Sequence, residues 1–401
     1  MERIIFHIDV NSAFLSWEAC ENLKNGGTED YREELAAVGG DIERRHGIIL
    51  AKSILTKPYG VTTGEPIVNA LRKCPGLKII PPHHSLYHGY SAKFIAILKQ
   101  YSEKVEQFSI DEAFVDMTGT ELLFGKPAEA ADRIREQIRR ELGFTVNVGV
   151  ANCKLCAKMA SDFQKPDRTH TLFQSEIPSK MWPLPVGDLF FVGKNTASKL
   201  HSLGIRTIGD LAHYDRNTLK RILGKAGEGL WQSANGIDES EVESIRPDAK
   251  GYSNETTTPY NITDPGEARE ILRELTEKVA SRLRHDGVRI ETVGVILKYA
   301  DFSRASHQVT MTAPTNITSE LYEKVCRLFQ EIWDGRPIRL VGVQTTKIAS
   351  PDAGRQLSLF DTTDYEKLEK LDSALDEIND RFGKGSVVRA SNASFKQPKI
   401  P

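Results

Sequence analysis

Acidic side chains lie within the most apolar, strand-like segments of this 401-residue chain. Residues 3–9 read as a buried strand that ends on Asp9, and Asp111 and Glu112 lie at the centre of the hairpin-like segment 107–117. Burying a carboxylate in apolar surroundings is costly unless another group neutralises its charge. One or two divalent cations would remove that cost. The pattern is therefore compatible with a fold that brings these acids together around metal.

Paired Mg²⁺ sites of this kind serve in-line phosphoryl transfer. One ion lowers the pKa of the attacking hydroxyl and the other stabilises the leaving pyrophosphate. The alternative interpretation is that Asp111 and Glu112 are turn acids and that Asp9 caps a helix. Their spacing alone leaves both interpretations open.

Hydrophobic periodicity predicts an α+β chain with several domains. In its first half the order of strands and helices is compatible with a sheet that carries helices on one face. The elements expected there are a strand at 3–9, a hairpin at 107–117, a helix at 127–142, a strand at 144–151 and a helix at 152–163.

The second half of the chain contains two segments with different patterns of predicted secondary structure. Residues 183–236 read as short helices punctuated by glycines, and residues 237–250 as a polar linker. Residues 251–348 follow the order β-α-β-β-α-β, which matches a ferredoxin-like arrangement. An acidic, helical stretch is expected at 363–381.

Composition excludes several classes of protein. A hydrophobic content of 39% argues against wholesale disorder, and no apolar run is long enough for a membrane helix. The first residues do not resemble a signal peptide, so we expect a cytoplasmic protein without a membrane partner. With 53 Lys plus Arg against 55 Asp plus Glu, the net charge of −2 taken alone argues against a nucleic-acid binder.

The chain resembles a known family over nearly its whole length, and three segments carry the motifs of that resemblance. They are His7–Phe14, Ser109–Phe114, and a block that runs from Gly149 through Asp162 to Lys165-Pro166. With these motifs the chain resembles the Y-family translesion DNA polymerases, and within them the bacterial DinB-like (DNA polymerase IV) branch.

The resemblance implies an α+β right-hand polymerase with a ferredoxin-like palm, small fingers, a helical helix-hairpin-helix thumb and a β-α-β-β-α-β little finger. The implied boundaries are palm 1–10 and 75–165, fingers 11–74, thumb 166–237, linker 238–250, little finger 251–348 and a tail 349–401.

The resemblance also implies the roles of the active-site residues. Asp9, Asp111 and Glu112, with the carbonyl of Val10, would hold two Mg²⁺ ions. Phe14 falls on the steric gate, whose ring leaves no room for a ribose 2′-hydroxyl.

Lysines would bind the nucleotide triphosphate. Lys165 falls on the triphosphate lysine of the family, and Lys57 falls where relatives often carry an arginine. The chain departs from the family pattern at Asn11, Ala13 and Ile54, which leaves its nucleotide affinity open.

Two further regions are implied to hold primer–template DNA. In the thumb, Val192, Gly193 and Lys194 would offer backbone N–H groups to a phosphate, although Phe191 replaces the usual first glycine of this hairpin. In the little finger we expect contacts from Lys298, Arg304 and Lys347. An ordinary helical turn and solvated strand residues are the respective alternatives.

The segment Gln356-Leu357-Ser358-Leu359-Phe360 resembles the peptide by which bacterial polymerases bind the sliding clamp. The implied function is low-fidelity, template-directed DNA synthesis from dNTPs by a monomer. A catalytically inactive polymerase-like scaffold for DNA repair and a pure nucleic-acid binding module are the rival hypotheses.

Overall fold

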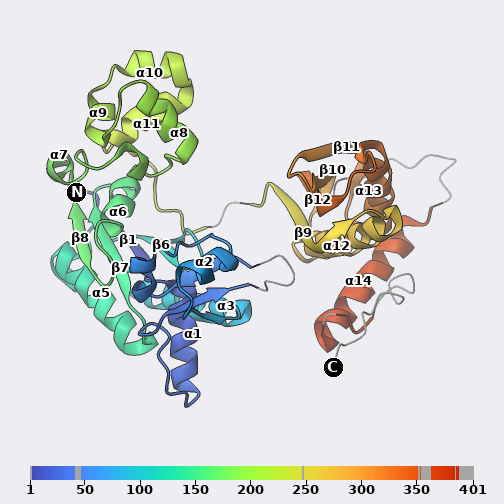
Figure 1. Ribbon diagram of the computed structural model, residues 1–401, viewed down its shortest axis with the longest axis horizontal. Helices are drawn as coiled ribbons and strands as arrows, with labels where there is room; N and C mark the ends of the chain where they lie inside the picture. The colour runs from blue at the N-terminus through green and yellow to red at the C-terminus, as the bar shows by residue number, and fades with distance from the viewer. Residues whose placement is uncertain are drawn as a thin grey trace. The chain divides into compact units, whose positions relative to one another are not determined.

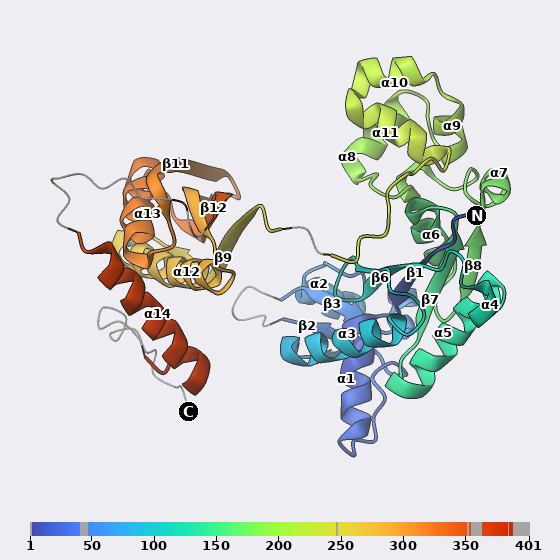
Figure 2. The ribbon, with the colours of Figure 1, turned by 180° about the vertical axis from the view of Figure 1, so that it is seen from behind.

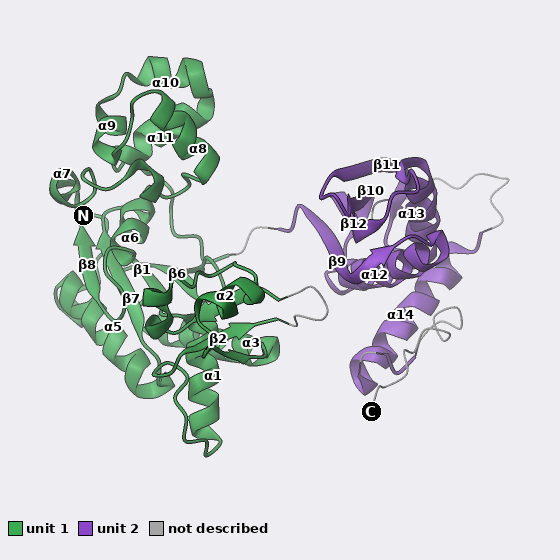
Figure 3. Ribbon diagram, viewed as in Figure 1, with its two compact units in different colours: residues 1–40, 47–246 green, residues 41–46, 247–401 purple. Residues whose placement is uncertain are grey.

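A computed structural model describes residues 2–40, 47–245, 248–350, 353, 363–383 and 385–387. The chain divides into two compact units (Figure 3), of which the first comprises residues 1–40 and 47–246 and the second contains the described residues from 248 onward. None of the described helices is long and apolar enough to cross a membrane.

A five-stranded sheet forms the centre of the first unit, with strand order β5-β6-β1-β7-β8. The middle strand β1 is buried along its whole length and runs antiparallel to both neighbours, β6 and β7. The strands are β1 (Ile5–Val10), β5 (Val105–Gln107), β6 (Glu112–Asp116), β7 (Val146–Ala151) and β8 (Thr169–Leu172). The expected hairpin at 107–117 is confirmed as β5 and β6, which pair antiparallel.

Helices cover both faces of this sheet, so the expectation of helices on one face was wrong (Figures 1 and 2). Phe6 and Ile8 pack with α3 (His84–Leu98) and α5 (Pro127–Leu142). Ile5 packs on the opposite face, with α6 (Lys154–Ser161). The order of elements in the sequence does not reveal which face a helix covers. The remaining short helix here is α4 (Glu121–Phe124).

A second, three-stranded sheet has the order β3-β2-β4. Its strand β4 pairs in parallel with β2, although it lies beyond residue 74, where the fingers segment was expected to end. The small sheet therefore draws in a strand that follows the expected boundary. Its elements are α1 (Ala13–Lys24), β2 (Ala36–Gly39), β3 (Ile49–Lys52), the 3₁₀ helix η1 (Ile54–Tyr59), α2 (Ile67–Lys73) and β4 (Lys78–Ile80).

Short helices follow, as the glycine-punctuated pattern predicts. Side-chain caps begin two of them: Thr207 accepts the N–H of Asp210, and Asp215 accepts the N–H of Thr218. The helices are η2 (Gln174–Glu176), α7 (Ile177–Lys180), η3 (Val186–Asp188), α8 (Lys194–Ser202), α9 (Ile208–His213), α10 (Arg216–Leu223) and α11 (Lys225–Ala234).

The second unit confirms the predicted order β-α-β-β-α-β. Its antiparallel sheet has the order β11-β10-β12-β9, and its two long helices supply one apolar core with it. The helix α14 (Tyr365–Phe382) confirms the helical stretch expected at 363–381. The other elements are β9 (Gly251–Ile262), α12 (Pro265–His285), β10 (Arg289–Tyr299), β11 (Arg304–Thr315), α13 (Thr318–Ile332) and β12 (Ile338–Ala349).

Candidate active site

Two of the three predicted acids face each other across neighbouring strands. Asp9 of β1 lies opposite Glu112, the first residue of β6. Asp9 is a strand residue and does not cap a helix, since Ser12 is the N-cap of α1. Only 7% of its surface is exposed, so its charge needs a partner within the protein.

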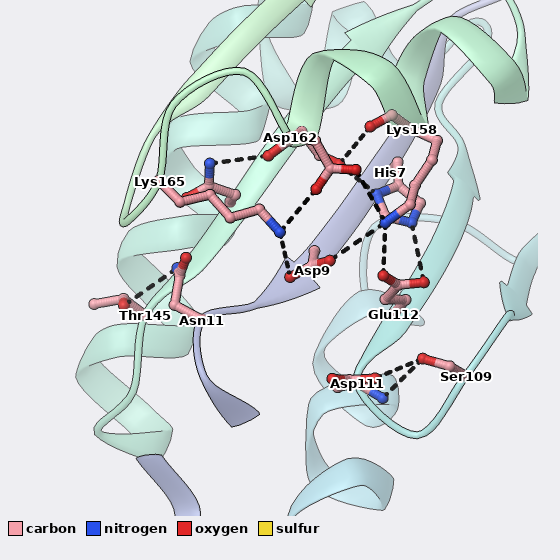
Figure 4. A network of polar contacts seen from close by, with 12 residues as sticks. His7, Asp9, Asn11, Ser109, Asp111, Glu112, Thr145, Lys158, Asp162 and Lys165 are labelled. Atoms are coloured by element: carbon pink, nitrogen blue, oxygen red, sulfur yellow. Dashed lines mark hydrogen bonds and ion pairs between the residues drawn. The ribbon is translucent and has the colours of Figure 1, made fainter. Parts of the chain in front are cut away.

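Lys158 of α6 reaches between these two carboxylates (Figure 4). Its Nζ lies 2.6 Å from Glu112 Oε1 and 3.4 Å from Asp9 Oδ2, and a third carboxylate, Asp162, is also 3.4 Å away. Gly149 of β7 makes this approach possible, because a Cβ there would lie 2.0 Å from the carbonyl oxygen of Ala157 in α6. The glycine lets α6 lie directly on the sheet.

A second lysine neutralises the other oxygen of Asp9. Lys165 Nζ lies 3.0 Å from Asp9 Oδ1 and 2.9 Å from Asp162 Oδ1. Asp9 thus has one ammonium group on each side, and Asp162 accompanies both lysines.

The shared environment shifts the pKa values of the two carboxyl groups in opposite directions. Burial opposes ionisation of Asp9, but Lys165 and Lys158 outweigh it and hold the pKa of Asp9 below its ordinary value. Burial and the neighbouring Asp9 raise the pKa of Glu112 to about 7. The pair therefore carries more negative charge than the surrounding protein readily accommodates, which is a condition that favours a bound divalent cation.

Asp111 is placed differently from the other two acids. It lies in the turn before β6, where its carbonyl accepts the N–H of Val10 at 3.0 Å. Its carboxylate accepts the hydroxyl of Ser109 at 2.6 Å and does not join the Asp9–Glu112 pair. Among the described residues no three His, Cys, Asp or Glu side chains are arranged as a metal cluster.

The oxygen donors nevertheless fit Mg²⁺, which prefers carboxylate and carbonyl ligands. Asp9, Val10 and Asp111 line one cavity of about 520 Å³. Glu112 lies opposite Asp9 in the sheet but does not line this cavity.

The same cavity brings together the three residues that were predicted to contact the nucleotide. Phe14, Lys57 and Lys165 line it, together with Lys52 and the half-exposed Ile54. Lys52 was missed in the sequence, where nothing distinguishes it from a surface lysine. Burial and the nearby charge of Lys57 lower its pKa, which marks the wall formed by β3 and η1 as cationic.

Phe14 lies in the first turn of α1, where aromatic packing fixes its ring. The ring stacks on Tyr87 at a centroid distance of 4.5 Å and an interplanar angle of 14°. The Tyr87 hydroxyl in turn donates to Glu18 Oε1 at 2.5 Å. Asn11, one of the departures from the family pattern, donates to Thr145 and not to the acids.

Lys158 was also missed as a site residue. It lies inside the third motif, four residues before Asp162, so a helical periodicity would have placed the two side chains on the same face. His7, which is fully buried beneath Glu112, was likewise missed. Burial and the charge of Lys158 lower the pKa of His7 to about 3, so its ring is uncharged at neutral pH.

The predicted phosphate-binding hairpin lies at the start of α8. Gly193 is the N-cap of this helix and Lys194 its first residue, while Val192 is buried beneath them. A Cβ at Gly193 would meet no atom within 4 Å, so the backbone there is open. Phe191 takes a left-handed φ of 69° with its side chain 77% exposed, which is a conformation that glycine adopts more readily.

In the second unit the structure brings together two of the three predicted cations. Lys298 of β10 lies opposite Arg304 of β11, and its Nζ lies 4.6 Å from the ring centre of Phe302. Lys347 lies towards the other end of β12, whose residue Leu340 is the neighbour of Lys298. The clamp-like segment 356–360 lies outside the described residues.

Comparisons with known proteins give a consistent result. Family models match residues 8–162 (impB/mucB/samB family), residues 249–359 (the C-terminal domain of that family) and residues 187–238 (DNA polymerase-iota, thumb domain). The chain is 42% identical to "DNA polymerase IV" of Clostridium acetobutylicum, covering 97% of this chain and 98% of the relative. It is 39% identical to "DNA polymerase IV 2" of Bacillus subtilis, covering 98% and 95%.

Among solved structures, a "Y-family DNA polymerase chimera Dbh-Dpo4(243-245)-Dbh" superposes with a TM-score of 0.75 at 24% identity, covering 86% of this chain and 99% of the chimera. This likeness confirms the predicted fold class.

Proposed function

Because the chain belongs to the Y-family of DNA polymerases and is a DNA-directed DNA polymerase of the DNA polymerase IV branch, we propose that it carries out low-fidelity translesion synthesis by a two-metal mechanism. The observation that supports this most directly is the carboxylate pair Asp9–Glu112, of which Asp9 lines a cavity that also contains three lysines. A primer 3′-hydroxyl attacks the α-phosphate of a dNTP, and pyrophosphate leaves.

Asp9, Asp111, Glu112 and the Val10 carbonyl are the proposed ligands of two Mg²⁺ ions, which would lower the pKa of the attacking hydroxyl and offset the charge that develops on pyrophosphate. The register of β1 and β6 holds Asp9 and Glu112 face to face. The Asp111 turn is tied to the end of the same strand through the N–H of Val10. The protein thereby fixes the ligands on rigid elements.

Lys52, Lys57 and Lys165 are proposed to bind the triphosphate. All three line the cavity, and Lys165 already contacts Asp9. A flexible ammonium group is suited to a polyanion whose oxygens change position during the reaction.

Phe14 is proposed as the steric gate. Its stacking on Tyr87 prevents the ring from moving aside, because Tyr87 is itself fully buried. A ribose 2′-hydroxyl would then meet a ring that cannot yield, and deoxyribonucleotides are selected.

The other segments take the roles that the family resemblance suggests. We keep the proposed palm, thumb, linker, little finger and tail, and we extend the fingers through β4, because β4 pairs with β2. The α8 hairpin and the cations Lys298, Arg304 and Lys347 are proposed to contact primer–template DNA. The segment 356–360 is proposed to bind the bacterial sliding clamp and so to raise the local concentration of a monomeric enzyme at its template.

Primer extension across defined lesions, with and without a bacterial clamp, tests this proposal. We expect Mg²⁺-dependent incorporation by the wild type and none above background by Asp111→Ala or Glu112→Ala. If these variants extend primers as the wild type does, the polymerase assignment of this site is wrong and the inactive-scaffold hypothesis gains ground. A variant with Leu359 and Phe360 changed to Ala should lose only the stimulation by the clamp.

A further inference from the structure

His7 is a buried histidine in the middle of the catalytic sheet that the proposed mechanism does not use. It lies in β1 two residues before Asp9, with 0% of its surface exposed. Because side chains alternate along a strand, it faces the same side as Asp9, towards α6. Its ring packs against Phe114, with ring centres 4.7 Å apart.

One nitrogen of the ring has a partner and the other does not. Nδ1 lies 2.8 Å from the hydroxyl oxygen of Ser161, near the end of α6. Nε2 is buried without a hydrogen-bond partner, and Glu112 Oε2 lies 3.9 Å from it. Buried nitrogens of this kind are rare in folded proteins and call for an explanation.

The Ser161 hydroxyl decides which nitrogen carries the proton. It has one hydrogen and two acceptors at 2.8 Å, the carbonyl of Lys158 and Nδ1 of His7. When Ser161 donates to the carbonyl, the uncharged ring must donate from Nδ1, and Nε2 is a bare acceptor. When Ser161 donates to Nδ1, the hydrogen moves to Nε2, which then points at Glu112.

The two oxygens of Glu112 face different side chains. Lys158 binds Oε1 at 2.6 Å, and His7 faces Oε2. Lys158 also has another acceptor at 3.4 Å, Asp162, which is the C-cap of α6. An ammonium group and a divalent cation repel each other, so Lys158 can leave Glu112 for Asp162 when metal binds.

We infer that His7 is a positioning residue for Glu112: it donates Nε2–H to Oε2 and keeps the other oxygen, Oε1, directed at the metal site once Lys158 has left. A shift of about 1 Å closes the present gap to hydrogen-bond length. Partners of this type orient metal-binding side chains in many sites, and their loss weakens metal affinity or activity about 10- to 100-fold. The inference rests on the proposed function and deepens it.

The rival explanation is that His7 only fastens β1 to α6 through Nδ1 and Ser161. Two substitutions separate the alternatives, because the amide of Asn can reach the Nδ1 position and the amide of Gln the Nε2 position. His7→Asn keeps the contact with Ser161 and loses the donor to Glu112, whereas His7→Gln does the reverse. Ser161→Ala removes the fastening contact. The hydrogen of the uncharged ring then stays on Nε2, because Nδ1 has lost its acceptor and Glu112 still offers one to Nε2.

The experiment measures Mn²⁺ bound to the full-length protein by electron paramagnetic resonance, with a dideoxy-terminated primer–template and the matching dNTP. We expect His7→Asn to weaken Mn²⁺ binding about 10- to 100-fold. His7→Gln and Ser161→Ala should stay within about threefold of the wild type. Steady-state kinetics with an extendable primer should show the loss in His7→Asn in kcat more than in KM for the dNTP.

Thermal unfolding identifies variants that are simply misfolded. The inference is overturned if well-folded His7→Asn binds Mn²⁺ like the wild type, or if His7→Gln or Ser161→Ala loses as much affinity as His7→Asn. Failure of the proposed function looks different, because the wild type itself would then neither bind Mn²⁺ nor extend a primer.

Discussion

The two large sheets of this protein differ in whether their polar side chains are buried or exposed to solvent. The five-stranded sheet is covered by helices on both faces, so Asp9, Glu112 and His7 are held in fixed positions by buried partners. The sheet of the second unit packs α12 and α13 against one apolar face. Its strands leave Lys298 and Arg304 in contact with solvent.

The difference follows from whether helices cover both faces of a sheet or only one. A polar side chain buried between a sheet and a helix needs a hydrogen-bond or charge partner. That partner fixes the position of the side chain closely enough for catalysis. A polar group on an uncovered face is solvated and can adapt, which suits contact with a long polyanion. Substitutions in the covered sheet should therefore have large effects, and those in the open sheet small ones.

The largest effect is expected for Asp9→Asn, which removes the charge that Lys158 and Lys165 share. We expect primer extension to fall on the order of 10²–10³-fold, the scale for losing one preorganised electrostatic group. Single-turnover incorporation measures this, with Asp162→Asn as the matched variant, since Asp162 contacts the same lysines from the rim. Equal losses in both variants would contradict the special role of Asp9.

The next effect concerns stability and pH. Since the pKa of Glu112 is raised to about 7 in the folded protein from an ordinary 4.5, the folded state holds a proton through this window that the unfolded chain has released. The metal-free protein should thus gain up to about 3 kcal/mol as the pH falls from about 7 towards 4.5. Chemical denaturation of wild type and Glu112→Gln measures it. A Glu112→Gln profile as steep as that of the wild type would contradict the assignment.

Phe14→Ala should relax the selection against ribonucleotides. We expect the ratio of kcat/KM for dNTP over rNTP to fall roughly 100-fold, which corresponds to about 2.7 kcal/mol. Tyr87→Phe is the control, because it keeps the stacked ring and removes only the hydroxyl bonded to Glu18. Loss of selection in the control alone would place the gate elsewhere.

The smallest effects should come from the open sheet. Lys298→Ala or Arg304→Ala should weaken DNA binding only a few-fold and lower the dependence of log K on log salt by about one unit each. Lys278→Ala, an exposed lysine of α12, is the matched control. Fluorescence anisotropy at several salt concentrations decides, and a hundredfold loss at either position would refute the view that this face binds through many adaptable contacts.

Much of the fold followed from local patterns. The amphipathic helix expected at 127–142 is α5 with the same bounds, because its apolar period, the proline at its start and Gly143 at its end are all encoded within the segment. The order of strands and helices in the second unit was also predicted from the sequence. The parallel pairing of β4 with β2 was not, since it depends on a contact between segments that are separated by β3 and two helices.

The candidate site was predicted in composition but not in arrangement. Asp9, Asp111 and Glu112 stood out because acids inside apolar strands are costly, and that reasoning needs only the sequence. The position of the Asp111 carboxylate relative to the other two acids depends on the turn before β6 and on its hydrogen bond with Ser109. Lysines and a buried histidine carry no such signal on their own.

By itself, then, the sequence determined many of the strands and helices, the acids that must be neutralised and the motifs that place the chain in its family, because these depend on neighbouring residues and on the chemistry of each side chain. Only the tertiary structure decided that α6 covers the face of the sheet that carries Asp9 and Glu112, with Lys158 between them. Those partners are 149 and 46 residues away along the chain. Their meeting depends on strand register and on the absent side chain of Gly149, which no local pattern encodes.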